Sequence, residues 1–191
     1  MSTCDKLITK DLEARCSNPL VQGFESVGYI IRKADIKEYT MTGRIVSAIT
    51  LNTGCKATRV VVKTKKPYDG SQTEMAAGDN RNTYTKTINF LVLDDGEDVA
   101  DAMEALKDEA FVFINERVFK AGDEKHAFEV VGLEQGARAA SQLNNPNDDA
   151  TEGGWSVSET EEKCEKARIY FNAGGTDPVE SSRTALEALC Q

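Results

Sequence analysis

The only histidine of the chain, His126, limits the nucleophilic chemistry that the sequence can support. Activation of a serine or cysteine by histidine needs an organised set of partners, and no motif around His126 indicates one. The apolar alternation of the segment HAFEVV favours a place for His126 at the edge of a strand. The chain also lacks a Gly-x-Ser-x-Gly motif, a P-loop and a dinucleotide fingerprint, and residues 172–176 (NAGGT) are typical of a turn that enters a helix. We therefore expect no catalytic residue, no cofactor and no enzymatic activity.

Two acidic clusters carry the oxygen ligands that Ca²⁺ and Mg²⁺ prefer. The first contains Asp94, Asp95, Glu97 and Asp98, and the second contains Asn147, Asp148, Asp149 and Glu152. Neither cluster has the alternating spacing and terminal glutamate of an EF-hand loop. Helix capping explains the first cluster and a solvated loop explains the second. We expect no metal site, and a small metal- or ligand-binding enzyme domain built from these loops stays open as an alternative.

Composition indicates one compact folded unit. The 191 residues are 40% hydrophobic and 29% charged, which suits a single domain with a sizeable core. The net charge of -9 argues against a surface devoted to nucleic acid. The sequence has no apolar run of the roughly 18 residues that a membrane helix needs and no signal-peptide core, so we expect synthesis in a cytoplasm and no membrane partner. The five widely spaced cysteines are expected to be free thiols.

Charge is distributed unevenly along the chain. Residues 1–120 carry 17 Lys and Arg against 18 Asp and Glu, whereas residues 121–191 carry 6 against 14. A basic run without intervening acid comprises Lys56, Arg59, Lys63, Lys65 and Lys66. Unlike surfaces on one subunit suit head-to-tail assembly, in which a rotation closes a ring. An uneven surface without functional meaning explains the same distribution equally well.

Short β-branched and aromatic runs separated by Gly, Asp and Asn predict successive strands. The expected strands cover residues 29–31, 36–41, 45–51, 57–64, 83–93, 111–119, 126–131, 155–158 and 167–171. Helical spacing of apolar residues predicts one amphipathic helix after Asp94. We expect the side chains of Asp94 and Glu97 to form a capping box at its start. Asp177 and Pro178 predict the start of a second helix. The polar stretch 132–154 is expected to be a surface loop or to include a short helix near 135–143.

The 18 residues from 65 to 82 separate two expected strands and are rich in Gly, Asp and Asn. A link of this length inside a compact domain is usually functional, so we expect a long projecting loop. The predicted fold class is mainly β (α+β), an antiparallel β-sandwich or barrel with one packed central helix and terminal helices. The expected divisions are an N-terminal helical arm (1–27), a core (28–171) and a C-terminal helix (172–191).

The order of several segments carries a resemblance to a known class of proteins. The segments are RIVSAITL, ATRVVVKT, TINFLVL, EDVADAMEALKDE, FVFINERVF, HAFEVVGLEQGARA and NDDATEGGWSVSETEE. In this order they resemble virion structural proteins of tailed bacteriophages, in particular tail-tube-like and connector-ring subunits such as those of crAss-like phages of gut bacteria. The resemblance covers about residues 28–171.

The resemblance implies a homo-oligomeric ring, sixfold or twelvefold, around the channel through which the genome passes. It implies a place in the virion tail, other tail or connector proteins as partners, and a passing contact with DNA. The implied interface residues lie in the projecting loop and comprise Lys65, Lys66, Tyr68, Gln72, Glu74 and Met75. Arg59 and Lys63 share one side of an expected strand and would face the lumen. A monomeric adaptor that binds protein through the long loop is a further alternative.

Overall fold

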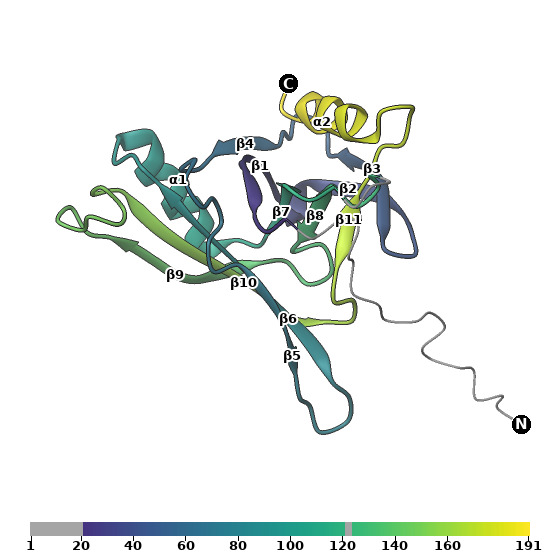
Figure 1. Ribbon diagram of the computed structural model, residues 1–191, viewed down its shortest axis with the longest axis horizontal. Coiled ribbons are helices and arrows are strands. Elements are labelled where there is room, and N and C mark those ends of the chain that lie inside the picture. The colour runs from purple at the N-terminus through teal and green to yellow at the C-terminus, as the bar shows by residue number, and fades with distance from the viewer. Residues whose placement is uncertain (1–20, 121–123) are drawn as a thin grey trace, which may run out of the picture.

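The computed structural model describes residues 21–120 and 124–191, which form two stacked β-sheets and two α-helices (Figure 1). The strands are β1 (Phe24–Arg32), β2 (Ile36–Thr42), β3 (Ile45–Leu51), β4 (Thr58–Val61), β5 (Gln72–Ala76), β6 (Thr83–Val92), β7 (Phe111–Arg117), β8 (Phe128–Val131), β9 (Arg138–Asn144), β10 (Trp155–Cys164) and β11 (Ile169–Phe171). The helices are α1 (Glu97–Asp108) and α2 (Pro178–Ala188), and a 3-10 turn, η1 (Lys33–Asp35), joins β1 to β2.

The larger sheet has the strand order β2-β3-β11-β8-β7-β1-β4, and β7 near its centre is buried on both faces. Because side chains alternate along a strand, β7 contributes to two separate cores. Val112 and Ile114 lie in the core under α2, together with Leu186 of that helix. Phe111 and Phe113 lie in the second core, which the smaller sheet and α1 cover. The larger sheet is therefore the middle layer of the molecule.

The smaller sheet has the order β5-β6-β10-β9 and packs its inward residues against the larger sheet. Phe90 of β6 and Val157 of β10 are register partners and are both buried. Helix α1 adds Met103 and Leu106 to the same core, as the helical spacing in the sequence predicts. Figure 1 shows α1 at one end of the long axis and α2 above the larger sheet.

The predicted mainly β, α+β class is confirmed, and the sheets form an open sandwich. The barrel alternative is wrong, because β2 and β4 end the larger sheet and β5 and β9 end the smaller one without closing. All strand pairs are antiparallel in the described chain except β11 with β3, where Tyr170 lies opposite Ile45. This parallel pair brings the segment before α2 into the middle of the larger sheet.

Helix capping follows the sequence prediction in α2 but not in α1. Asp177 caps α2, and its Oδ1 accepts a hydrogen bond from the backbone N–H of Glu180 at 2.9 Å. In α1 the N-cap is Gly96, and no side chain caps the helix. Asp94 Oδ1 accepts from the N–H of Gly96 at 3.0 Å. The predicted capping box is therefore wrong, because the side chain of Asp94 closes a turn at Gly96, before the helix begins at Glu97.

Two regions for which the sequence predicts no strand contain strands in the structure. The segment near 135–143 is neither a loop nor a short helix, because it contains β9, which pairs with β10 along its length. Gln142 Nε2 also donates to the carbonyl of Met103 at 3.1 Å, which ties β9 to α1. At the other end of the chain, β1 begins at Phe24, inside the expected arm 1–27. Residues 1–20 of that arm lie outside the described residues.

Candidate functional site

The expected projecting loop 65–82 is in part a strand. Within it, β5 pairs with the first half of β6, from Gln72 opposite Thr87 to Ala76 opposite Thr83. Figure 1 shows this hairpin, which we call the hairpin arm (residues 72–87), reaching beyond the two stacked sheets. Met75 on the arm is 60% exposed. The arm is thus an ordered extension of the smaller sheet, in which β6 also pairs with β10 as far as Tyr84 opposite Cys164, and it carries an apolar side chain in solvent.

The structure separates the six expected interface residues into two groups. Five of them are exposed, namely Lys65, Lys66, Gln72, Glu74 and Met75. The sixth, Tyr68, is buried, and its assignment to a subunit interface is wrong. Left-handed backbone conformations at Lys66 and Tyr68 turn the chain inward. The ring of Tyr68 consequently lies 5.8 Å from that of Phe24 and 6.1 Å from that of Phe90, inside the core between the sheets.

The two expected lumen residues lie along the free edge of the larger sheet. Arg59 is exposed on β4, next to the 53% exposed Val61. Lys63 follows the end of β4, and its backbone N–H donates to the carbonyl of Leu91 at 3.3 Å. Val62, between them, is buried. The alternation predicted for this segment is confirmed, while the orientation of the edge toward a channel stays a prediction.

A cavity of about 270 Å³ lies between the sheets beside the hairpin arm. Its charged and amide side chains from the larger sheet are Asn115, Arg117, Glu129 and Arg168, and we call it the arginine pocket. Glu129 Oε2 lies 3.7 Å from Nε of Arg117 and 3.4 Å from Nη1 of Arg168. These residues come from β7, β8 and the segment before β11, which are neighbours in the sheet and distant in the sequence. No local motif marks them, so sequence analysis missed the pocket.

Strand register explains the polar character of the pocket. Asn115 lies opposite Gly28 on one side and Glu129 on the other. A Cβ atom at Gly28 would come within 2.3 Å of both Asn115 Oδ1 and the hydroxyl of Tyr68, so only glycine fits there. Asn115 is 1% exposed, and its Nδ2 has no hydrogen-bond partner within residues 21–120 and 124–191. The pocket therefore contains a buried donor for which the described part of the chain provides no acceptor.

A second buried polar cluster lies deeper between the sheets. Glu161 accepts hydrogen bonds from the backbone N–H groups of Gly132, Glu134 and Gln135 at 2.8 to 2.9 Å. The Nζ of Lys86 lies 3.3 Å from the same carboxylate. Burial alone would raise the pKa of Glu161, but Lys86 and the backbone donors bring it below its ordinary value. This cluster fixes the turn before β9 to the smaller sheet, and its groups are fully engaged in that structural task.

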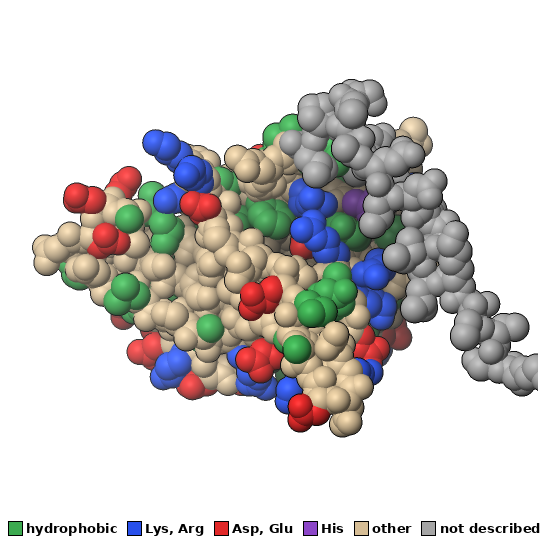
Figure 2. All heavy atoms as spheres, turned by 60° about the horizontal axis from the view of Figure 1, so that its bottom comes forward, with side chains coloured by type: hydrophobic (Ala, Val, Ile, Leu, Met, Phe, Trp, Pro, Cys, Tyr) green, Lys and Arg blue, Asp and Glu red, His purple; other side chains and the backbone are tan. Residues whose placement is uncertain are grey.

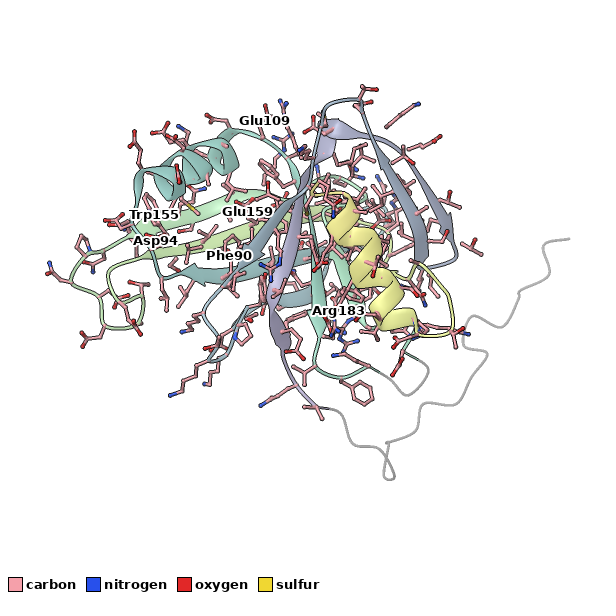
Figure 3. All side chains as sticks on the ribbon, turned by 90° about the horizontal axis from the view of Figure 1, so that it is seen from above. Phe90, Asp94, Glu109, Trp155, Glu159 and Arg183 are labelled. Atoms are coloured by element: carbon pink, nitrogen blue, oxygen red, sulfur yellow. The ribbon has the colours of Figure 1, made fainter. Side chains whose placement is uncertain are left out.

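Glu159, two residues before Glu161 on β10, is a second buried acid, and it takes no part in the Lys86–Glu161 cluster. It lies on β10 opposite Ile88, with no exposed surface, and neither carboxylate oxygen has a partner among the residues that the structure describes (Figure 3). Burial raises the pKa of this carboxyl group to about 8. Glu159 is therefore neutral at pH 7 in the folded protein.

The remaining chemistry-bearing residues have local roles. The ring of His126 packs edge-on against Tyr170, with centroids 4.7 Å apart, just before β8. In the acidic loop, Asp148 Oδ1 accepts from the N–H of Ala150 at 3.4 Å. Within the described ranges, no three His, Cys, Asp or Glu side chains are arranged to hold a metal ion. Cys55, Cys164 and Cys190 are free thiols.

No helix in the part of the chain that the structure describes is long and apolar enough to cross a membrane. Comparison of the chain with family models, curated proteins and solved structures finds no match.

Proposed function

We propose that this chain is a structural subunit of a bacteriophage tail or portal-proximal connector, and that its copies assemble into a ring or tube that forms the genome channel. The hairpin arm is the observation that carries this proposal. Its strand β5 ends the smaller sheet and so has one edge without a strand partner in the described chain, and the arm exposes Met75 beyond the body of the molecule. An edge strand that carries an exposed apolar side chain is suited to being covered by a neighbouring subunit.

Free sheet edges support the same proposal. A strand at the edge of a sheet presents unpaired N–H and C=O groups that can pair with another chain. β4 and β9 are edge strands of the two sheets, and each exposes a large apolar side chain. Val61 is 53% exposed on β4, and Leu143 is 58% exposed on β9. Edges of this kind favour lateral contacts between copies.

The proposal includes the symmetry of the assembly, its location and its partners. It is a homo-oligomer, sixfold or twelvefold, located in the virion tail, with other tail or connector proteins above and below. Arg59 and Lys63 on the free edge of the larger sheet are the residues that would touch passing DNA, because phosphate contacts need Lys or Arg. The residues of the arm and the loop before it that would touch the neighbouring subunit are Lys65, Lys66, Gln72, Glu74 and Met75.

Sedimentation velocity combined with negative-stain electron microscopy tests the proposal. The wild-type protein is expected to form rings or short tubes as concentration rises. Met75→Glu should weaken this association at least about tenfold while circular dichroism stays unchanged. Leu93→Glu is the matched control, since Leu93 is 42% exposed just after β6, at the end of that strand away from the arm. A wild-type protein that stays monomeric at every concentration, or a Met75→Glu protein that assembles normally, would contradict the proposal.

A further inference from the structure

The arginine pocket has more hydrogen-bond donors than the described chain uses. Two guanidinium groups, Arg117 and Arg168, share a single carboxylate, Glu129, so the three charged groups sum to one positive charge. The side chain of Arg117 is only 19% exposed. Asn115 adds a buried amide donor that has no acceptor in residues 21–120 and 124–191. A buried donor of this kind is unfavourable unless an acceptor reaches it. The pocket is therefore suited to an incoming acceptor that carries negative charge.

The opposite end of the molecule offers such acceptors. Residues 94–101 and 144–154 together carry eight carboxylates and no Lys or Arg, and we call this surface the acidic end. Asn144 Nδ2 joins the two segments through a hydrogen bond to Asp95 Oδ1 at 3.1 Å. Figure 1 places α1 and the β9–β10 turn at one end of the long axis, and β8 and β11 in the other half.

Both signs of charge occur across the face that Figure 2 shows. Red Asp and Glu side chains lie at its left tip with blue Lys and Arg side chains just above them, and blue side chains also lie beside the purple histidine in the right half. Surfaces of opposite charge on one protomer attract each other between copies, and they cannot meet within one copy when they lie at its two ends.

We propose that the acidic end of one copy docks in the arginine pocket of the next copy. This inference rests on the proposed function and names the residues that join two subunits. The contact is heterologous, because a different surface is used on each partner. Repetition of such a contact closes a ring when the rotation is suitable and otherwise gives an open filament.

The turn between β9 and β10 is the part of the acidic end that enters the pocket. A cavity of about 270 Å³ accommodates side chains from a turn but not a helix. Asp149 and Glu152 are exposed on this turn, whereas Asp148 is half-buried and already accepts from Ala150. A carboxylate of Asp149 can accept from Arg168, whose side chain is 44% exposed. The docked acid neutralises the excess charge of the pocket.

Two variants break the contact from its two sides. Asp149→Lys combined with Glu152→Lys destroys the acidic turn and leaves the pocket intact. Arg168→Glu damages the pocket and leaves the turn intact, and it is chosen over Arg117 because its side chain is 44% exposed. Lys107→Glu on α1 is the matched control for charge reversal of an exposed basic residue, since the side chain of Lys107 is 61% exposed and lies outside both the pocket and the acidic end. Circular dichroism and urea unfolding verify that each variant folds.

The decisive measurement is sedimentation velocity of the variants alone and mixed. Each variant alone should be monomeric where the wild-type protein assembles, and Lys107→Glu should assemble normally. A mixture of the two variants retains one intact turn and one intact pocket, so it should form a one-to-one dimer that grows no further. This dimer should dissociate as salt rises from 0.05 to 0.5 M, because the contact is between charges.

Each other outcome separates this inference from the proposed function. If the wild-type protein forms rings and both variants also form rings, the docking contact is wrong and the ring function stands. If the mixture gives the dimer but the wild-type protein gives open filaments, the docking contact is right and the ring function is contradicted. If neither the wild-type protein nor the mixture associates, both are wrong.

Discussion

Replacement of Glu159 by Gln is expected to raise the free energy of unfolding by an amount that grows with pH. Glu159 is completely buried on β10, and its two oxygens have no hydrogen-bond partner in the described ranges. Burial raises the pKa of this carboxyl group from 4.5 to about 8. The native protein therefore keeps a proton that the unfolded chain releases once the pH exceeds 4.5.

Proton linkage gives the magnitude. Between pH 4.5 and about 8 the native state binds one proton more than the unfolded state, so stability falls by about 1.4 kcal/mol for each pH unit. At pH 7 the accumulated loss is about 3 kcal/mol. Glu159→Gln should recover this amount because an amide stays neutral at every pH. Near pH 4 the carboxyl group of Glu159 is neutral in both states, and the two proteins should be almost equally stable.

Urea unfolding at pH 4, 5, 6, 7 and 8, followed by circular dichroism at low protein concentration, measures the difference. Glu162→Gln is the control, because Glu162 is exposed on the same strand and its replacement should leave stability unchanged at each pH. A stability difference for Glu159→Gln that does not vary with pH would refute the reasoning, since it would mean that Glu159 carries the same charge in both states.

Two further substitutions test how the layers are held together. Arg183→Met should lower the free energy of unfolding by about 2 kcal/mol at pH 7, because Arg183 on α2 binds both carboxylate oxygens of Glu116 at 2.8 and 2.6 Å. Burial alone would raise the pKa of Glu116, but Arg183 and Lys120 hold it below its ordinary value, so this loss should shrink as the pH falls through that lowered pKa. Urea titrations from pH 7 to 3 measure it, and an effect independent of pH would contradict the ion pair. Tyr68→Ala should lower the free energy of unfolding by about 3 to 5 kcal/mol at pH 7, because it removes a buried ring. Tyr68→Phe should lower it far less. An alanine variant as stable as the wild type would contradict the burial of Tyr68 in the core.

Elements with a strong apolar pattern could be predicted from the sequence. Alternating β-branched and aromatic residues marked β3, β6 and β7, because burial of one or both strand faces leaves that pattern in the sequence. The same reasoning placed α1 through Met103 and Leu106. These elements face a core, so the apolar residues whose burial stabilises them lie within the elements themselves.

Edge strands and the arginine pocket could not be predicted in this way. β5 and β9 are polar strands at the ends of the smaller sheet, and their backbone pairing with β6 and β10 decides their structure. Arg117 and Arg168 lie 51 positions apart in the sequence and come together only because β8 stands between β7 and β11. Strand order is a property of the whole fold, and no local pattern records it.

The base of the hairpin arm is fixed in one position because the inward register pairs of β6 and β10 change from apolar to charged along the two strands. Register pairs that face the larger sheet run from Phe90 with Val157, through Ile88 with Glu159, to Lys86 with Glu161. The last pair forms the base of the arm, and it is fixed by an ion pair and by hydrogen bonds from the turn before β9. Apolar contacts allow two sheets to slide, whereas directional hydrogen bonds to one carboxylate permit a single arrangement. In the proposed assembly, an arm in one fixed orientation would meet each neighbouring subunit at the same angle, and a closed ring requires a constant angle.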